Sequence, residues 1–463
     1  MRSNSAVAVQ VDEAAVESLL AACDENAVVL VRFLYCDTGG LIRGKSVSRQ
    51  ALRSALRSGV GLTVAMAAMN PFDQLQVVDG MGPVGEVRLW PDLSTFHVLP
   101  YAPHQAALFC DLYDLNGQPW EACARNFLRR AIARGEAAGW RFEAAFENEF
   151  TLAVTDTSGS FHPFDETVCF SSIAMQAVGN LPVALLQALE AQGVSMQQYY
   201  PELSAGQHEI SVRHAPVLQA ADNQLRARET IRAIAQQAGF HASLAPKPFA
   251  NLAGNGAHVH ISGWSLDAPG QNRFYDVADR FGLSQEAYHF IGGILAHLPA
   301  VVALTCPTVN SYLRLAPQTW ASAYRCFGPD NREAAVRIAS GFWGDPQGSA
   351  NVEIKTVDNS CNPYLALGAI LTAGLDGIKK GIEPGDPLSV DPATLSEAER
   401  QQRRIDPLPR SLDEALAALA GDALLREAMG PMLFSAFEAV KRSESAFFVD
   451  VDHDDTRAYF SLF

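Results

Sequence analysis

The sequence lacks the glycine-rich motifs through which many enzymes hold a nucleotide. It contains no P-loop of the form Gly-x-x-x-x-Gly-Lys-Ser/Thr and no glycine fingerprint of a Rossmann strand–turn–helix unit. A nucleotide, if one binds, is therefore expected to be held by metal ions and arginine side chains.

Cysteine and positive charge are both scarce. Eight cysteines are scattered from Cys23 to Cys361 with no Cys-x-x-Cys pair and no zinc-type spacing, which favours reduced thiols and a cytoplasmic location. There are 35 Lys and Arg residues against 51 Asp and Glu, a formal net charge of -16. This balance argues against nucleic acid or an anionic membrane as the main partner.

Long apolar segments are missing as well. The N-terminal residues 1–13 have no apolar signal core. The longest apolar stretch, 291–304, contains His297 and Pro299, and we expect it to be too short and too interrupted to span a bilayer. We also find no internal repeat and no low-complexity tract.

The elements that are present predict an α+β protein of two domains. Residues 1–115 combine a helix at 11–24 with short strands, among them 28–35, and the turn at 116–119 marks a boundary. Strands and helices alternate over 116–463, with strands at 145–150, 209–212, 258–262 and 351–355 and helices at 121–138, 222–238 and 363–380.

Carboxylates at alternate positions carry the strongest chemical signal. Glu147 and Glu149 share one face if 145–150 is a strand, because side chains alternate with period two. Such a pair alone is also typical of a solvated strand face. Two further glutamates, Glu202 and Glu209, flank a glycine turn, and His258, His260 and Glu353 lie on later strands. Together these groups favour hard divalent cations such as Mg²⁺ or Mn²⁺ over zinc, although each histidine singly is also typical of a core or surface residue.

Arginines form a second group of candidate site residues. Arg314, Arg332 and Arg337 lie within 310–337 of an acidic chain and suggest clamps for phosphate or carboxylate ligands. Ion pairs on a helix surface with Asp330 and Glu333 are the alternative interpretation.

The order of these motifs resembles glutamine synthetase and its glutamate–amine ligase relatives over roughly 28–440. The resemblance rests on seven segments: Asp37-Thr38-Gly39-Gly40-Leu41-Ile42-Arg43-Gly44-Lys45, Glu147-Asn148-Glu149-Phe150, Gly206-Gln207-His208-Glu209, Asn255-Gly256-Ala257-His258-Val259-His260, Arg314-Leu315-Ala316-Pro317, Asn331-Arg332-Glu333-Ala334-Ala335-Val336-Arg337, and the helix that begins at Asn362-Pro363-Tyr364. Seven ordered motifs make a solvated face for Glu147 and Glu149 a poor explanation.

The resemblance implies a small β-grasp-like N-terminal domain (1–115) and a large catalytic α/β domain (116–463) with a curved antiparallel sheet. It also implies a homo-oligomer, two stacked hexameric rings with active sites between subunits. By motif position, the residues would have these roles: one metal at Glu149, Glu202 and Glu209; a second at Glu147, His258 and Glu353; ATP near His260, Ser262, Arg332 and Arg337; glutamate near Gly254, Arg314 and Lys355; Arg332 on the transferred phosphoryl group; and Asp37 at the amine site of the adjacent subunit.

Departures from the family pattern concentrate where ammonia would bind. Ammonia-using members carry a flap glutamate six residues after the arginine matched to Arg314, and here that position is Trp320, whose indole cannot act as a base. The sequence also departs from the family pattern at Ala253, Asn351 and Lys355, and of these Ala253 and Lys355 alter the acid pocket. We therefore expect an ATP-dependent ligase that joins glutamate to an amine larger than ammonia, apolar or aromatic, through a γ-glutamyl phosphate. An ammonia-using glutamine synthetase, a polyamine or alkylamine ligase and a non-catalytic relative are the alternatives.

Overall fold

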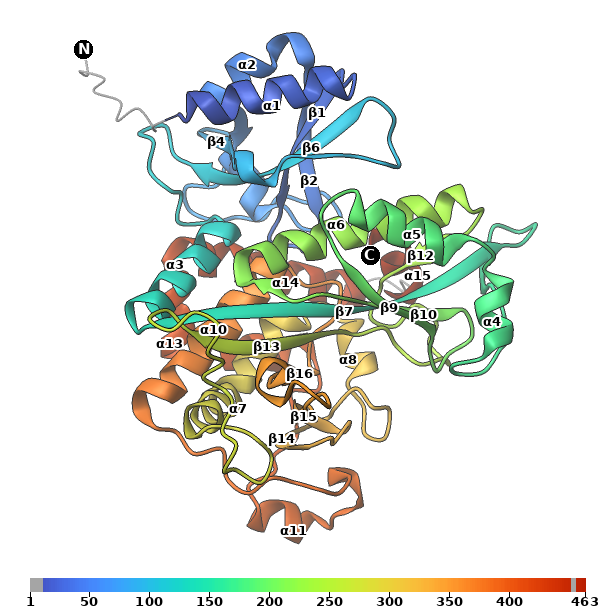
Figure 1. Cartoon of the computed structure of the whole chain (residues 1–463), viewed down its shortest axis with the longest axis vertical. Coiled ribbons are helices and arrows are strands. Elements are labelled where there is room, and N and C mark those ends of the chain that lie inside the picture. Colours follow the sequence, from blue (N-terminus) through green and yellow to red (C-terminus); the bar gives the residue numbers. More distant parts are fainter. Residues whose placement is uncertain (1–10, 451–454) are drawn as a thin grey trace.

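The computed structural model describes residues 11–450 and 455–463. Residues 1–10, for which the sequence predicts no signal segment, lie outside the described residues. The chain forms a smaller N-terminal part above a larger part that contains the long strand β7 (Figure 1). The expected class, two parts that each combine helices with a sheet, is confirmed.

The N-terminal part is a six-stranded sheet with the order β2-β1-β6-β4-β3, in which β5 also pairs with β6. The strand predicted at 28–35 is confirmed as β1, which pairs antiparallel with the edge strand β2 across the turn that begins at Asp37. β1 also runs parallel to β6, so the sheet is mixed. Its elements are α1 (Glu13–Glu25), β1 (Leu30–Cys36), β2 (Ile42–Ser48), α2 (Arg49–Ser58), β3 (Val60–Thr63), η1 (Val64–Ala68), β4 (Glu86–Pro91), η2 (Leu93–Thr95), β5 (His97–Val98) and β6 (Gln105–Tyr113).

The larger part is built on a ten-stranded sheet with the order β14-β15-β16-β13-β7-β10-β9, to which β8, β11 and β12 add along β7. The pairs are antiparallel except for β14 and β15, which run parallel, so the sheet expected to be antiparallel is mixed at one edge. Its strands are β7 (Trp140–Thr155), β8 (Phe161–Pro163), β9 (Met196–Pro201), β10 (Gln207–Val212), β11 (Ala215–Pro216), β12 (His241–Ser243), β13 (Ala257–Ser265), β14 (Tyr324–Pro329), β15 (Ala334–Ile338) and β16 (Val352–Ile354).

Helices cover this sheet, and two of them pack backbone against backbone. A Cβ atom on Gly377 would lie 2.0 Å from the carbonyl oxygen of His289, so only glycine allows this approach of α10 to α7. The helices are α3 (Ala124–Ala137), α4 (Ser172–Ala177), α5 (Leu181–Glu190), α6 (Val217–Gln237), α7 (Gln285–Thr305), α8 (Ser311–Arg314), α9 (Pro346–Ser349), α10 (Pro363–Lys380), η3 (Pro392–Thr394), α11 (Glu397–Gln402), α12 (Leu412–Gly421), α13 (Ala423–Met429), α14 (Pro431–Asp450) and α15 (Asp455–Leu462).

Two sequence interpretations are corrected here. The apolar stretch around His297 is not interrupted, because α7 continues through Pro299. In the described residues α7 is the one helix long and apolar enough to cross a membrane, but it is mostly buried in the core. The other correction concerns Arg332 to Arg337, where a turn leads into strand β15, so the helix-surface interpretation is wrong. Glu333 accepts a hydrogen bond from the Trp320 backbone N–H instead of pairing along a helix.

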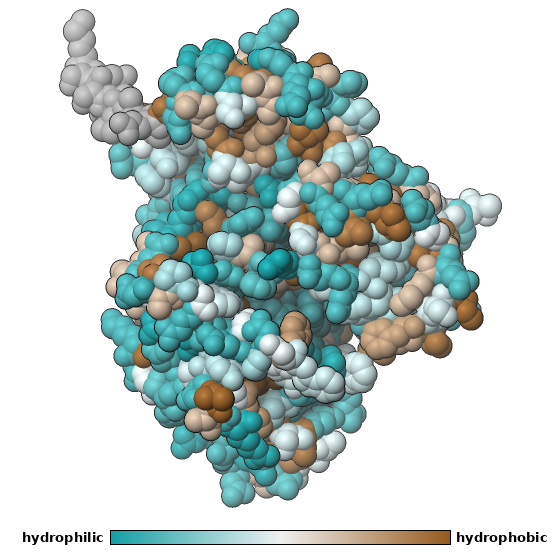
Figure 2. Space-filling model, in the orientation of Figure 1, coloured by the Kyte–Doolittle hydropathy of each residue, from teal (hydrophilic) through white to brown (hydrophobic). Residues whose placement is uncertain are grey.

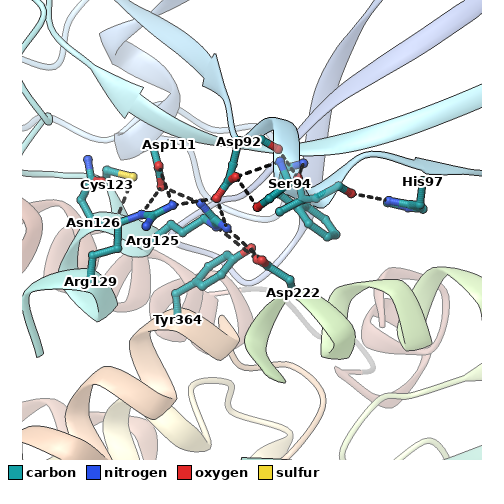
Figure 3. Close-up of polar contacts among 12 residues, drawn as sticks. Asp92, Ser94, His97, Asp111, Cys123, Arg125, Asn126, Arg129, Asp222 and Tyr364 are labelled. Carbon is teal, nitrogen blue, oxygen red and sulfur yellow. Dashed lines mark hydrogen bonds and ion pairs between the residues drawn. The ribbon is translucent and has the colours of Figure 1, made fainter. Parts of the chain in front are cut away.

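A buried ionic cluster joins the two parts (Figure 3). Arg125 of α3 contacts Asp111 of β6 and Asp92, which follows β4, at 3.0 Å each. It also donates to both carboxylate oxygens of Asp222 on α6, at 3.1 and 2.8 Å. The hydroxyl of Tyr364 on α10 donates to the same Asp222 at 2.6 Å. The N-terminal sheet is thus tied to three helices of the larger part through one arginine.

Candidate active site

Five adjacent strands, β10, β7, β13, β16 and β15, carry eight of the fifteen predicted site residues. Glu147 and Glu149 share a face of β7, as expected from their spacing. In the strand register Glu149 faces Glu209 of β10, and Glu147 faces His258 of β13. Like charges placed opposite one another across a pair of strands repel, so this sheet concentrates negative charge that a ligand can offset.

The same pattern continues onto β16 and β15. Glu353 faces His260 on one side and Arg337 on the other. Its carboxylate lies 3.3 Å from Nδ1 of His258, 4.0 Å from Nε2 of His260 and 2.7 Å from Nε of Arg337. Nε2 of His260 lies 3.3 Å from Glu147, so both histidines contact the two glutamates.

These strands open into a cavity of about 270 Å³. It brings together eleven of the predicted site residues: Glu147, Glu149, Glu202, Glu209, Gly254, His258, Arg314, Trp320, Arg332, Glu353 and Lys355. The other four, Asp37, His260, Ser262 and Arg337, do not line it.

Burial, together with the crowding of carboxylates, raises two pKa values in the cavity. Burial, helped by the neighbouring Glu149, raises the pKa of Glu202 to about 7. Burial also raises the pKa of Glu209 well above its ordinary value, and Glu149 and Glu147 act in the same direction. Protons on these groups relieve the repulsion among the carboxylates.

On the other side of the cavity, cations have the opposite effect. Burial opposes ionisation of Glu353, yet Lys355, His260 and His258 lower its pKa to about 2. In the same way His260 and His258 outweigh burial and hold the pKa of Glu147 well below its ordinary value. Burial would lower the pKa of His260, but the Glu147 and Glu353 carboxylates raise it to about 9.

The donor set fits divalent cations. Glu147, His260 and Glu353 offer ligand atoms within 4.8 Å of one another, whereas the histidine that the resemblance implies as the ligand beside these two glutamates is His258. Oxygen donors of Glu149, Glu202 and Glu209 line the same cavity. Carboxylate oxygens with one imidazole are the ligands that Mg²⁺ and Mn²⁺ accept. Burial and, after it, the neighbouring carboxylates raise the pKa values of Glu202 and Glu209, and a cation bound between these side chains would offset both effects.

The basic side chains of the cavity, apart from Arg332, are buried and fixed by their contacts. Arg314 is buried, and its Nη2 donates to the carbonyl oxygen of Val357 at 2.9 Å and to that of Lys355 at 3.3 Å. A Cβ on Gly254 would lie 2.7 Å from Cγ of Arg314, so glycine is needed where this loop passes the arginine. Lys355 is buried 3.7 Å from Glu353, whereas Arg332 is exposed at the cavity.

Comparison with protein-family models identifies the family to which both parts of the chain belong. The model described as "Glutamine synthetase, catalytic domain" matches residues 121–459, and the model "Glutamine synthetase N-terminal domain" matches residues 16–120. The chain belongs to the glutamine synthetase family.

Individual relatives span nearly the full chain. "Gamma-glutamylpolyamine synthetase GlnA3" of Streptomyces coelicolor is 37% identical over 427 residues, 92% of this chain and 91% of the relative. A "Glutamine synthetase" of Halobacterium salinarum is 34% identical over 91% of each chain. The solved structure described as "GmaS/ADP complex-Conformation 1" is 28% identical with a TM-score of 0.83 and covers 95% of this chain and 98% of that one. The protein is therefore an ATP-dependent carbon–nitrogen ligase of the glutamine synthetase family, whose members use ATP and divalent metals.

Within this glutamine synthetase site, sequence reasoning missed the residues that position Glu149. The side-chain amide of Gln207 donates to Glu149 at 3.1 Å, and the backbone N–H of Gly256 donates to the same oxygen at 2.8 Å. Both residues lie in the motifs that carry the resemblance, so their place in those motifs was the available signal.

The aromatic residues of the cavity were only partly foreseen. Trp320 lines it as expected, but so do Phe170 and Tyr200, which no motif contains. Phe72 of the N-terminal part does not line this cavity, and its ring stacks on Phe447 with centroids 4.2 Å apart. No methionine among the described residues lines the cavity either.

Two of the predicted residues that do not line the cavity are buried in other contacts. Asp37 is buried in the N-terminal part, where it pairs with Arg43 at 2.5 Å, and its backbone carbonyl accepts from Asn362 at 2.9 Å. Ser262 is buried on β13, and its hydroxyl oxygen accepts a hydrogen bond from the Trp264 indole at 2.8 Å. Their roles in amine and ATP binding stay predictions.

Proposed function

We propose that this enzyme joins the γ-carboxylate of glutamate to an amine larger than ammonia, with an apolar or aromatic body, at the expense of ATP. The observation that carries the proposal is Trp320. It stands where the resemblance implies the ammonium-binding glutamate, it lines the cavity, and its side chain is 51% exposed. An indole offers an apolar face and no base, so it favours an amine that is nucleophilic without deprotonation by the flap.

The other predicted residues bind the other two substrates, glutamate and ATP. In this proposal Arg314, Lys355 and the backbone at Gly254 bind the glutamate carboxylates. Arg332, exposed at the cavity, neutralises charge on the transferred phosphoryl group. His260, Ser262 and Arg337 hold ATP at the β13–β15 side of the sheet.

Two divalent ions complete the proposed site, one at Glu149, Glu202 and Glu209 and the other at Glu147, His258 and Glu353. When bound, they supply positive charge beside the phosphates and the acyl phosphate oxygens. Gln207 and Gly256 hold the Glu149 carboxylate in a fixed orientation, which keeps this metal ligand preorganised. As part of the same proposal, subunits assemble into two stacked hexamers, and Asp37 of one subunit contributes to the amine site of the next.

A polyamine is the second candidate for the amine. The 37% identity to the relative named gamma-glutamylpolyamine synthetase favours it. A cationic amine could also bind against the Trp320 face through cation–π attraction. An ammonia-using glutamine synthetase is the third outcome, supported by the several relatives that carry that name.

The test is ADP release with a panel of amines at fixed, saturating ATP and glutamate. Arylamines, alkylamines, polyamines and ammonium are compared by kcat/KM for the purified full chain. We expect kcat/KM to be higher for a bulky apolar or aromatic amine than for ammonium. Trp320→Glu should lower the ratio of kcat/KM for that amine to kcat/KM for ammonium by about 5- to 10-fold, because roughly 1 kcal/mol of ring contact is lost.

A matched control removes a tryptophan elsewhere. Trp343 is fully exposed and lies outside the cavity, so Trp343→Ala should leave the amine preference unchanged. Equal use of ammonium and every amine by the wild type would contradict the proposal, and so would an unchanged preference in Trp320→Ala. A polyamine as the best substrate would favour the second candidate.

A further inference from the structure

Two aromatic side chains at the cavity are held in an unusual backbone conformation. Phe170 has φ of +56° and Trp320 has φ of +58°, a left-handed region that bulky residues rarely adopt. Both rings line the cavity, and Phe170 is 63% exposed. Strained backbone of this kind persists where the surrounding structure enforces it, and it concentrates at ligand sites.

The segment around Phe170 is anchored on both sides. Its backbone N–H donates to the carbonyl oxygen of Pro201 at 3.1 Å, and Ser171 caps the helix α4 that follows. The Phe170 ring meets the Tyr200 ring edge-on, with centroids 5.4 Å apart. The Tyr200 hydroxyl donates to Glu209 at 2.5 Å, so the Phe170 ring is connected through one residue to the carboxylate end of the cavity.

The loop that carries Trp320 is also anchored by hydrogen bonds. Gln318 and Ser322, two residues away on either side, also have left-handed backbones. The Trp320 N–H donates to Glu333 at 2.7 Å, and the Ser322 hydroxyl donates to the carbonyl oxygen of Ala334 at 2.8 Å. Among the residues that the structure describes, no other aromatic ring or guanidinium packs against the indole, which leaves its face open to a ligand.

Phe170 also belongs to an exposed apolar cluster, and this offers a competing explanation. Hydrophobic residues gather at the surface around α4 on the right of Figure 2, and Val168, Ile173 and Met175 are exposed beside Phe170. A subunit contact would account for such a patch. It would not account for the ring of Phe170 lining the same cavity as Trp320 and five glutamates.

We infer that Phe170 is a second specificity-determining residue, which shares with Trp320 the recognition of the amine's apolar body. This inference rests on the proposed function. Two aromatic faces select for a carbon skeleton large enough to touch both, whereas ammonium and hydroxylamine are too small to reach either ring while the nitrogen attacks the acyl group. The specificity determinant therefore includes the loop before α4 as well as the flap.

The experiment compares Phe170→Ala and Phe170→Leu with the wild type. For each full-length variant, kcat/KM is measured for the best amine of the panel and for hydroxylamine, whose product is the γ-glutamyl hydroxamate. We expect the ratio of the two values to fall about 10-fold in Phe170→Ala and by less in Phe170→Leu, which keeps apolar volume but no ring. Ile173→Ala, three residues away and 69% exposed but outside the cavity, is the matched control and should keep the wild-type ratio.

A double variant separates a shared amine site from two independent effects. If both rings touch the same amine body, the losses in Phe170→Ala and Trp320→Ala should not be additive in the double variant. Size-exclusion chromatography of every variant checks assembly. A change in oligomeric state in both Phe170→Ala and Ile173→Ala, with the substrate ratio intact, would overturn the inference in favour of a subunit contact.

Failure of this inference differs from failure of the proposed function. If the wild type prefers a larger amine but Phe170→Ala lowers kcat/KM equally for that amine and for hydroxylamine, only the role of Phe170 is refuted. If the wild type prefers ammonium to every amine, the proposed function fails and the inference fails with it. Should Phe170→Ala not fold, Phe170→Leu is measured in its place, alone and combined with Trp320→Ala, and an unchanged substrate ratio there refutes the role of Phe170.

Discussion

Replacing Arg125 by alanine removes the one cation in the described part of the chain that contacts all three aspartates between the two parts. The side chain of Arg125 is 2% exposed, and Asp222 and Asp111 are nearly as buried. After the replacement Asp222 keeps its hydrogen bond from Tyr364 but no direct ion pair. Removing one partner of a buried pair costs about 3–5 kcal/mol of the free energy of unfolding, because a charge is left buried and uncompensated.

Arg129 offers a matched comparison within the same cluster. It contacts Asp92 and Asp111 as well, at 2.7 and 3.1 Å, but its side chain is 40% exposed. Arg129→Ala should therefore cost only about 0–1 kcal/mol, the usual value for a solvated pair. Arg125→Lys should lie between the two variants, since lysine keeps the charge but cannot make the two parallel hydrogen bonds to Asp222.

The assay is equilibrium urea unfolding at pH 7 and fixed protein concentration. Tryptophan fluorescence and far-ultraviolet circular dichroism are followed together, and their coincidence shows that one transition is being compared. If Arg125→Ala loses less than about 1 kcal/mol, no more than Arg129→Ala, then the cluster does not stabilise the junction by ion pairing and the reasoning is refuted.

Three further predictions concern the site. Glu149→Ala and His258→Ala should each abolish ADP formation while the circular dichroism spectrum is kept, because each loses a metal ligand; near-normal turnover with Mg²⁺ or Mn²⁺ would refute that assignment. Burial raises the pKa of Glu202 to about 7, so its carboxylate is mostly protonated at pH 6 and mostly ionised at pH 8, and the affinity for Mn²⁺ should rise about tenfold over this range. Electron paramagnetic resonance of free Mn²⁺ measures this, and a flat profile would contradict it. Mixed oligomers of Asp37→Ala and Glu149→Ala subunits should recover part of the activity that each variant lacks; no recovery after verified mixing would argue against a shared site.

Period-two patterns made the centre of the site predictable from sequence. The spacing of Glu147 and Glu149 predicted their common face correctly, and Pro363 predicted the start of α10, because proline at the first helical position loses no hydrogen bond. The same local reasoning failed at Pro299, where burial among the core helices keeps α7 continuous despite the missing N–H.

Residues brought in by loops were not predictable in this way. Phe170 lies in a segment without periodicity, and its left-handed backbone depends on contacts with Pro201 and Tyr200, some thirty positions later in the chain. The segment Ala334-Ala335-Val336-Arg337 fits a helix and a strand equally well by pattern. Only its pairing with β14 and β16 decides for the strand.

The central position of α7 has a consequence for synthesis on the ribosome. Its main packing partner α10 ends at Lys380, well after Thr305 at the end of α7 (Figure 1). At typical elongation rates the intervening chain of about 75 residues takes roughly 4–15 s to make. Throughout that interval an apolar helix has emerged without the surface that buries it, and the nascent chain is prone to aggregate. Chaperone binding to the nascent chain should therefore be greatest before α10 is complete. A ribosome-bound chain truncated after α7 should bind ribosome-associated chaperones more strongly than one truncated after α10.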